Sequence, residues 1–269
     1  MLGSGFVKSM RRQGINVNVW NRTFEKAKAL EASGAHAFES AADAARGAQL
    51  IEICVRDEAA VDAVINDALA GMTAGVPVVD HTTVDVASVA PRAQRLHDAG
   101  HPFLHAPVFM GPPQAENAQG IMLASGAQAT FDAVEPHLTK LTGKLKYFGD
   151  RVDLAATYKL MGNAMILAVI GGINDVLTIA QAQGLSRTQA YELFSFYSVE
   201  PQITGRGRKM VDGDYSPLWT LDMADKDARL MQRAANGEKL PVIDAVEGAL
   251  RAQIDRHLGD RDLGAIAAR

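Results

Sequence analysis

The chain has 269 residues, of which 48% are apolar and 22% charged, as in soluble globular proteins with one large domain or two modest ones. A net charge of -4 without a long Lys/Arg cluster argues against nucleic acid or an anionic membrane surface as a partner. A single cysteine, Cys54, excludes an intrachain disulfide and suggests a cytoplasmic protein, with Cys54 as a small core residue. No apolar segment of a signal peptide opens the chain, and the apolar stretch at 160–173 looks too short and too polar for a membrane span.

The first part of the chain alternates predicted helices and strands up to residue 150. Several of these strands are continuous apolar runs, which is typical of a parallel sheet covered on both faces. A doubly wound α/β domain is therefore predicted for residues 1–150. The predicted strands are 15–20, 35–38, 50–55, 76–81, 103–108, 120–125 and 145–148, and the helices are 1–13, 23–34, 40–46, 58–70, 85–99 and 128–141.

After residue 150 the pattern is helical only. An apolar run at about 152–183 predicts one long interdomain helix, which Gly184 ends. Proline and glycine residues separate the further helices, predicted at 187–198, 201–212, 221–236 and 241–256. Residues 151–269 are therefore predicted to form an all-α domain.

Four polar loops follow predicted strands, and ligands of doubly wound sheets bind at the carboxyl ends of strands. After the strand at 15–20, Asn21, Arg22 and Thr23 offer a cation and neutral hydrogen-bonding groups in place of an acidic residue. This chemistry suits the 2′-phosphate of NADP, although a helix cap with a solvated arginine fits the same residues. The other loops are Val55-Arg56, Asp80–Thr83 and Pro107–Gly111.

Lys159 and Asn163 interrupt the long apolar helix. They are four residues apart and so lie on one helix face. A buried lysine with a lowered pKa can act as an acid or polarise a carbonyl group, and Asn163 can then orient a polar substrate. Alternatively, Lys159 extends its amine to solvent and Asn163 bonds to a neighbouring helix.

The seven histidines and the single cysteine form no metal-ligand spacing or nucleophile motif, so no metal is predicted. His81 and His105 follow or end predicted strands and could line a cleft. Core or surface roles are the simpler interpretation for both.

The order and spacing of five segments resemble the β-hydroxyacid dehydrogenases, which include 3-hydroxyisobutyrate dehydrogenase and the glyoxylate/succinic semialdehyde reductases. The architecture is also similar to that of 6-phosphogluconate dehydrogenases and imine reductases. The resemblance covers nearly the whole chain. Its segments are Asn21–Thr23, Val79–Thr83, His105–Gly111, Lys159–Asn163 and Lys226-Asp227.

The resemblance implies an oxidoreductase that passes hydride between a nicotinamide and a hydroxy or carbonyl substrate, in a homodimer or higher homo-oligomer. Lys159 matches the family's catalytic lysine and Asn163 its substrate-binding partner. The positions that match cofactor-binding residues are Leu2, Gly3, Asn21, Arg22, Thr23, Val55, Arg56, Thr83 and Lys226. NADP is the expected cofactor, with NAD less favoured.

Two departures from the family pattern bear on function. Phe109 and Met110 replace a serine and a glycine that help to hold a substrate carboxylate, and only Gly111 is kept, so a bulkier or less acidic carbonyl substrate is expected. The family also begins with a strand and Gly-x-Gly-x-x-Gly, of which Gly3 matches the third glycine alone. We therefore expect weak cofactor binding, and a higher NADPH affinity and melting temperature once an upstream strand is restored. Two alternatives are a catalytically silent binding module of the same fold and an imine reductase, which Lys159 disfavours.

Overall fold

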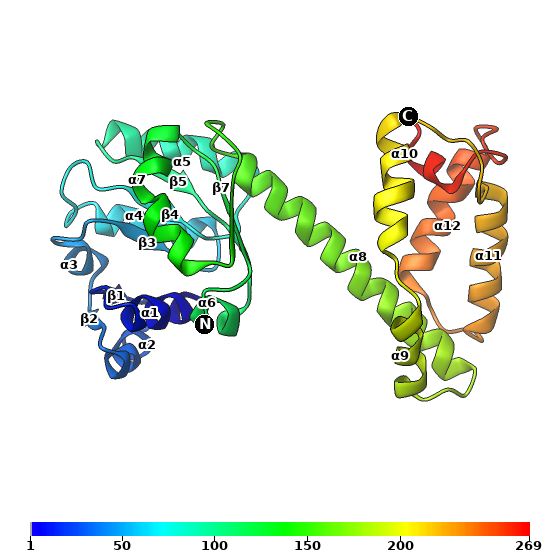
Figure 1. Ribbon diagram of the computed structural model, residues 1–269, viewed down its shortest axis with the longest axis horizontal. Helices are drawn as coiled ribbons and strands as arrows, with labels where there is room; N and C mark the ends of the chain where they lie inside the picture. The colour runs from blue at the N-terminus through cyan, green and yellow to red at the C-terminus, as the bar shows by residue number, and fades with distance from the viewer. Residues whose placement is uncertain (1) are drawn as a thin grey trace. The chain divides into compact units, whose positions relative to one another are not determined.

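The computed structural model describes residues 2–269 and divides the chain into two compact units, one ending at Asn163 and one spanning Ala164–Arg269. Unit 1 is α/β and unit 2 is helical (Figure 1). The long helix α8 (Leu154–Ala182) begins in unit 1 and continues into unit 2. The predicted fold class is confirmed, and the predicted domain boundary at residue 150, four residues before α8, stays a prediction.

The strands of unit 1 form three small sheets. β1 pairs with β2 in parallel, β3, β4 and β5 are parallel in that order, and β7 pairs in parallel with β8. An antiparallel bridge between His105 and Ser125 links the second sheet to the third. The strands are β1 (Asn18–Trp20), β2 (His36–Phe38), β3 (Ile51–Ile53), β4 (Val78–Asp80), β5 (Phe103–His105), β6 (Val108–Phe109), β7 (Ile121–Ala124) and β8 (Lys144–Tyr147).

The single strand predicted at 103–108 is wrong. Residues Ala106 and Pro107 separate β5 from β6, and β6 runs antiparallel to β7, with Phe109 opposite Ile121. Proline has no backbone N–H and cannot continue a ladder of hydrogen bonds. The break is local, because His105–Ser125, Val108–Met122 and Phe109–Ile121 keep one antiparallel register and the Leu123 N–H donates to the Pro107 carbonyl at 2.9 Å. Phe109 therefore continues the direction of β5.

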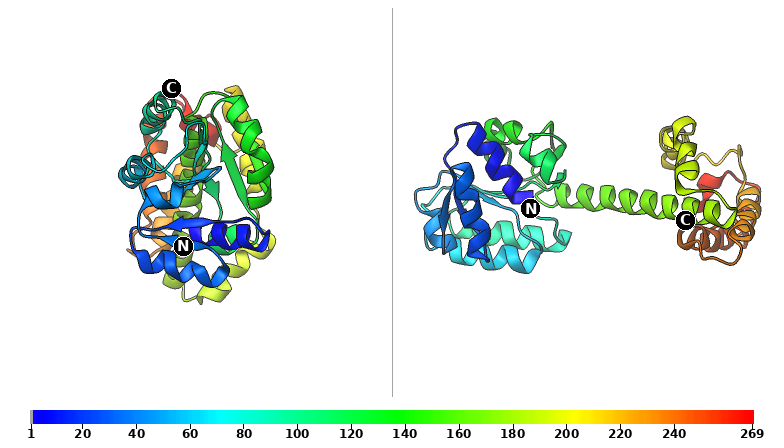
Figure 2. Two further views of the ribbon diagram at one scale, coloured as in Figure 1. Left: turned by 90° about the vertical axis from the view of Figure 1, so that its left-hand side faces the viewer. Right: turned by 90° about the horizontal axis from the view of Figure 1, so that it is seen from below.

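Helices cover both faces of the central strands (Figure 2). Side chains alternate across β4, so that Val78 packs in a cluster with α4 and α5, while Val79 packs in a second cluster with α1 and α7. Two-sided burial explains why these strands are continuous apolar runs. The helices of unit 1 before α8 are α1 (Leu2–Arg12), α2 (Phe24–Lys28), α3 (Ala41–Ala45), α4 (Glu58–Ala68), α5 (Val86–Asp98), α6 (Pro112–Glu116) and α7 (Gln128–Leu138), with short 3-10 turns at Ala29–Ser33 and Thr139–Leu141.

Unit 2 has its own small core around Leu221 and Leu250, formed between α11, α12 and the C-terminal turn. The helices of unit 2 after α8 are α9 (Arg187–Phe196), α10 (Gly207–Asp212), α11 (Leu221–Ala234) and α12 (Pro241–Ile254), with a π-helical turn at Gln202–Arg206 and a 3-10 turn at Leu263–Ala267.

Helix α8 is long and apolar enough to cross a membrane by length and composition, and only 11% of its most apolar 18-residue window is buried. The expectation that this stretch is too short and too polar is therefore wrong. The helix continues past Asn163 to Ala182 and so extends beyond the 14 residues on which that expectation relied. Length and composition alone do not identify what covers these side chains.

Candidate active site

The first turns of α8 carry the lysine site, and Ser125 fixes where this helix starts. The Ala155 N–H donates to Ser125 Oγ at 2.9 Å, and the Ser125 hydroxyl donates to the Val152 carbonyl at 2.7 Å. Ser125 follows β7 and is fully buried. The sheet therefore sets the position of Lys159, one turn further along α8.

Lys159 is 9% exposed, and its Nζ donates to Asn163 Oδ1 at 3.0 Å. The Nζ atom also lies 4.1 Å from the centre of the Phe109 ring, as in a cation–π contact. Burial lowers the pKa of Lys159 from its ordinary value. Of the two interpretations of this residue, the buried amine paired with Asn163 is the one present, rather than an amine extended to solvent.

Met110 and Gly111 continue the chain from Phe109 into α6. The Gly111 N–H donates to Gln114 Oε1 at 2.8 Å and begins that helix, where Pro112 takes the first helical position. Met110 is half-buried against the core of unit 1. Of the three predicted substrate residues in this loop, only Phe109 contacts Lys159 in an observed interaction.

The predicted cofactor residues of unit 1 lie at the N-terminus of α1 and at the carboxyl ends of β1, β3 and β4. Asn21, Arg22 and Thr23 are exposed, and Asn21 Oδ1 accepts from the Thr23 N–H at 3.0 Å. No hydrogen bond or ion pair joins Arg22 to another described residue, although its charge contributes to a lowered pKa at Asp57 on the next loop.

Backbone contacts tie the remaining strand ends together. The Val55 N–H donates to Thr82 Oγ1 at 3.2 Å, joining the end of β3 to the end of β4. A Cβ added to Gly3 would lie 3.5 Å from Cys54 Cβ, so the start of α1 packs on the same edge. Cys54 is partly buried rather than in the core, and burial raises the pKa of its thiol to about 11. Thr83 is exposed beside this edge.

These residues fit a nicotinamide dinucleotide. The N-terminus of α1 at Gly3 packs on Cys54 at the end of β3, and the charge of Arg22 after β1 acts on Asp57 in the loop that follows β3. A helix N-terminus with a guanidinium nearby is an arrangement that binds phosphate groups. Lys226 lies in unit 2, exposed on α11, where its Nζ pairs with Asp227 Oδ1 at 2.9 Å. The predicted cofactor residues of unit 1 therefore lie at the carboxyl ends of its strands and at the start of α1, whereas Lys226 belongs to unit 2.

His81 and His105 are core residues rather than cleft residues. The His81 ring is buried, with Nδ1 2.8 Å from the Ala106 carbonyl and Nε2 3.2 Å from Glu52 Oε1. His137 Nε2 lies 3.2 Å from the other Glu52 oxygen. Burial raises the pKa of Glu52, but these two histidines outweigh it and lower the pKa to about 2. An acidic residue between the two isoleucines of β3 was the only sequence signal for this cluster.

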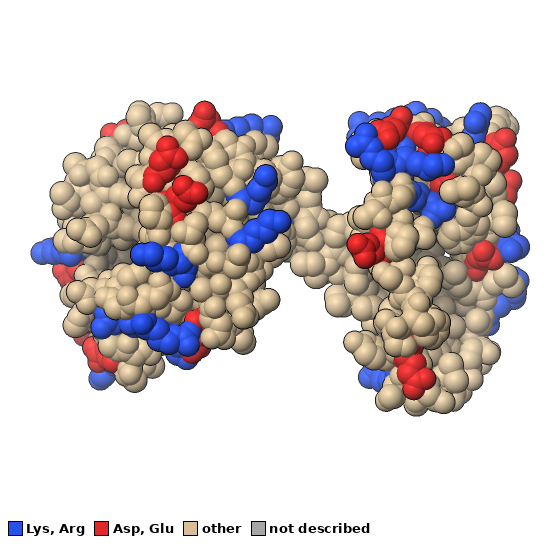
Figure 3. Space-filling view, viewed as in Figure 1, with Lys and Arg blue, Asp and Glu red and all other residues tan. Residues whose placement is uncertain are grey.

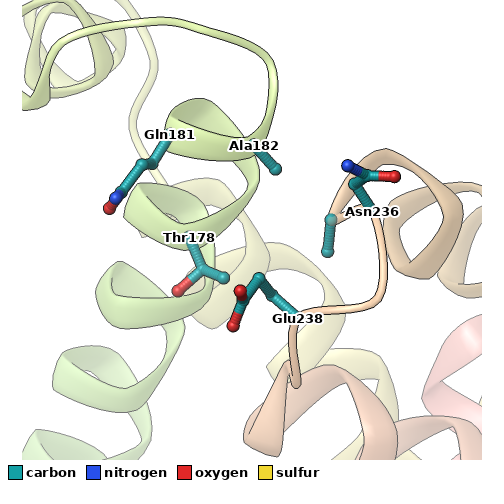
Figure 4. A pocket seen from close by; sticks show the side chains of 6 residues that line it. Thr178, Gln181, Ala182, Asn236 and Glu238 are labelled. Atoms are coloured by element: carbon teal, nitrogen blue, oxygen red, sulfur yellow. The ribbon is translucent and has the colours of Figure 1, made fainter.

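Two pockets occur away from the predicted residues. One, of about 350 Å³ within unit 2, is lined by polar side chains of α8 and of the turn after α11, including Thr178, Asn236 and Glu238 (Figure 4). The other lies over α1 in unit 1, where Lys8, Arg11 and Arg12 border Glu116 and basic atoms gather on the surface (Figure 3). Among the described residues, no group of three or more His, Cys, Asp or Glu side chains is placed to hold a metal ion.

Comparison with known proteins identifies the class. Residues 1–149 match the family of the NAD binding domain of 6-phosphogluconate dehydrogenase. Glyoxylate/succinic semialdehyde reductase 1 of Arabidopsis thaliana is 27% identical over 272 aligned residues, covering 99% of this chain and 94% of the relative. The protein is therefore an oxidoreductase that binds a nicotinamide dinucleotide. It belongs to the β-hydroxyacid dehydrogenase family, as the resemblance implied.

Solved structures agree on the fold. An imine reductase from Pseudomonas sp. superimposes with a TM-score of 0.91 at 23% identity, covering 100% of this chain and 96% of the other. An imine reductase from Myxococcus stipitatus in complex with NADP+ gives a TM-score of 0.89 at 20% identity, covering 98% and 95%. At this level of identity the likeness concerns the fold alone.

Proposed function

We propose that the protein is an NADP(H)-dependent dehydrogenase or reductase acting on CH–OH and carbonyl groups, with Lys159 as proton donor and acceptor. The observation that carries this proposal is the buried Lys159 amine, held by Asn163 and bordered by Phe109. The Arabidopsis relative is named as a reductase of glyoxylate and succinic semialdehyde, which are small carbonyl compounds.

The bound nicotinamide supplies the hydride. In the reducing direction the carbonyl carbon gains that hydride, and its oxygen gains a proton from Lys159, so that C=O becomes CH–OH while NADPH becomes NADP+. Burial brings the pKa of Lys159 closer to neutrality, which makes the proton easier to release. Asn163 Oδ1 holds the amine and sets the direction of its remaining N–H groups.

Substitution of Lys159 tests this role. Lys159→Met keeps the length and apolar stem of the side chain, and we expect it to lower kcat by about 10³-fold, within the range of general acid–base catalysis. NADPH affinity, measured by fluorescence titration, should change little. Lys144→Met, on the exposed surface of β8, is the control and should retain parental turnover. Turnover by Lys159→Met near the parental rate would reject the role of Lys159.

The preference for NADP rests on Arg22, an exposed guanidinium without a hydrogen bond or ion pair to another described residue. A charge-assisted hydrogen bond contributes about 1.5–3 kcal/mol, so Arg22→Ala should weaken NADPH binding roughly 10- to 100-fold. NADH lacks the 2′-phosphate and should bind the variant and the parent alike. Equal losses for both cofactors would reject this preference.

We also propose that the protein is a homodimer that covers the apolar side chains of α8. Leu167 is 73% exposed and Ile170 60%, which is unusual for large apolar residues in water. Leu167→Glu should convert a dimer into a monomer in size-exclusion chromatography with light scattering. A parent chain that is monomeric, or that needs detergent to stay in solution, would reject this proposal in favour of a monomer or a membrane-associated helix.

Two other functions remain to be tested. An imine reductase is favoured by the apolar Phe109 beside the amine, and NADPH oxidation with a cyclic imine would outpace that with any aldehyde or keto acid. A catalytically silent module would bind NADPH but oxidise it with none of these substrates. A screen of NADPH oxidation over aldehydes, keto acids and imines, with cofactor affinity measured in parallel, separates the three.

A further inference from the structure

The ring of Phe109 closes one side of the Lys159 amine. Within unit 1 the amine has two observed neighbours, the ring face at 4.1 Å and Asn163 Oδ1 at 3.0 Å, and neither is an anion. Burial lowers the pKa of Lys159, and no ion pair joins its amine to another described residue. A substrate carboxylate would find one cation here, and that cation is already needed at the carbonyl oxygen.

Gly162 provides the space that the ring occupies. A Cβ added to Gly162 would lie 2.8 Å from Cε1 of Phe109 and closer still to its Cζ, so any larger residue would displace the ring. Glycine inside a helix costs stability relative to alanine, yet it stands in the third turn of α8. The backbone that carries the ring is also held in place, because β6 pairs Phe109 with Ile121 on β7. Two elements therefore set its position.

We propose that Phe109, seated against Gly162, is a specificity-determining residue that makes this a site for uncharged carbonyl compounds with an aryl or alkyl group, rather than for small oxo acids. The inference rests on the proposed carbonyl chemistry at Lys159. A carboxylate against the ring loses hydration without a hydrogen bond in return, and the negative ring face repels it. An aryl or alkyl group in the same place gains apolar burial and ring contacts.

A matched pair of aldehydes tests this specificity. In 3-phenylpropanal and succinic semialdehyde the same two-carbon spacer joins the aldehyde to a phenyl ring or to a carboxylate. With NADPH, we expect the parent to prefer 3-phenylpropanal by at least about tenfold in kcat/KM, and Phe109→Ser to lower that preference by about 100-fold, as for the loss or gain of one polar contact. Phe109→Leu keeps an apolar side chain and should keep most of the preference.

A second pair of variants tests the seat of the ring. Gly162→Ala favours the helix, so it should fold, but its methyl group displaces the Phe109 ring. We expect Gly162→Ala to reduce the preference for 3-phenylpropanal roughly as Phe109→Ser does, within the discrimination that one contact provides. In a Phe109→Ala background the same change should have little further effect, because no ring remains to be displaced. Additive effects would show that Gly162 acts independently of Phe109.

Binding of the product alcohols decides the inference without any turnover. Calorimetry on the protein saturated with NADPH, with which an alcohol cannot react, would compare 3-phenylpropan-1-ol with 4-hydroxybutyrate, in the parent and in Phe109→Ser. The inference is supported if the parent favours the phenyl compound and the variant loses that preference. It is overturned if the parent binds both equally, or if Phe109→Ser keeps the parental preference. Loss of the Lys159 role would appear only as turnover that survives in Lys159→Met, so the two failures are distinguishable.

Discussion

Three buried aspartates, one in unit 1 and two in unit 2, differ in how many hydrogen bonds their carboxylates accept. Asp262 and Asp175 lie in unit 2, and Asp80 lies at the end of β4 in unit 1, and all three are at most 2% exposed. Burial penalises an ionised carboxylate in each case. From this difference we expect that hydrogen-bond partners, rather than depth, decide whether such a group stabilises the fold.

Asp262 has both oxygens occupied. Oδ1 accepts from Arg206 Nε at 2.9 Å and from the Gly264 N–H at 3.0 Å, and Oδ2 accepts from the N–H groups of Leu218 and Trp219 at 3.1 and 3.2 Å. Burial raises the pKa of Asp262, but Arg206 and these N–H groups outweigh it and hold the pKa well below its usual range. The carboxylate is therefore more stable ionised in the folded chain.

Asp80 has one oxygen without a partner. Oδ1 accepts from the Thr82 N–H at 2.8 Å, while no hydrogen bond reaches Oδ2 in the described chain. Arg92 Nη1 lies 3.8 Å and His105 Nδ1 3.9 Å from Oδ2. Burial, followed by the charges of Arg92 and His81, lowers the pKa of His105 to about 3, so this ring is neutral near pH 7. Burial also dominates at Asp80 and raises its pKa.

The largest expected loss is that of Asp262→Ala. It leaves Arg206 and three N–H groups without their acceptor, and breaking a buried pair in this way costs about 3–5 kcal/mol. Because the folded pKa is lowered, this stability is present above the unfolded pKa and disappears as the pH falls below about 4. Urea unfolding in a Trp20→Phe background, where the fluorescence of Trp219 reports on unit 2, measures it. A loss that is the same at pH 3 and pH 7 would contradict this account.

An intermediate loss is expected for Asp175→Ala. Asp175 Oδ2 accepts from the N–H groups of Val242 and Ile243, both at 3.0 Å, while Oδ1 has no partner in the described chain. Asp175 therefore caps the start of α12 from α8, and loss of such a cap costs roughly 0.5–2 kcal/mol. The same Trp219 readout applies, with Asp222→Ala, an exposed change on α11, as the control. A loss as large as that of Asp262→Ala would show that the number of hydrogen-bond partners does not determine how much stability is lost.

The sequence was sufficient for the features that depend on local pattern. Continuous apolar strands alternating with helices predicted the doubly wound unit. The helix predicted at 40–46 is present as α3, which Ser40 caps by accepting from the Asp43 N–H. Lys159 and Asn163 were found because two polar residues on one face of an apolar helix are unusual, and their hydrogen bond is present.

Contacts between distant residues were beyond reach. Phe109 was recognised as a departure from the family, but its seat against Gly162 joins β6 to α8 and leaves no periodic signal. The pairing of Glu52 with His137 was missed for the same reason, because the two residues lie 85 positions apart in the sequence. The pairing of Phe109 with Ile121 on β7 was also beyond reach, since an apolar run does not show which strand it pairs with.

The smallest effect is expected for Asp80→Asn. This substitution distinguishes the contribution of hydrogen-bond partners to stability from that of burial. Asparagine keeps the acceptor for the Thr82 N–H and removes a buried charge, while the lost attraction of Arg92 is weak at 3.8 Å and Arg92 still pairs with Asp62 at 3.0 Å. We expect the free energy of unfolding at pH 7 to change by less than about 1 kcal/mol, because an isosteric change that removes a buried charge, one oxygen of which lacks a hydrogen bond, is close to neutral.

The pH dependence of the stability of Asp80→Asn shows whether the ionised Asp80 carboxylate stabilises or destabilises the fold. The raised folded pKa of Asp80 means that the parent loses stability as the pH rises through that pKa, whereas asparagine does not titrate. The variant should therefore gain stability relative to the parent as the pH rises above the unfolded pKa of an aspartate, about 4. Unfolding in a Trp219→Phe background, in which Trp20 reports on unit 1, measures this difference at each pH. A loss of several kcal/mol at pH 7 that shrinks in acid would mean that the Asp80 carboxylate is stabilised by Arg92 as Asp262 is by Arg206, and the contrast between the two would be wrong.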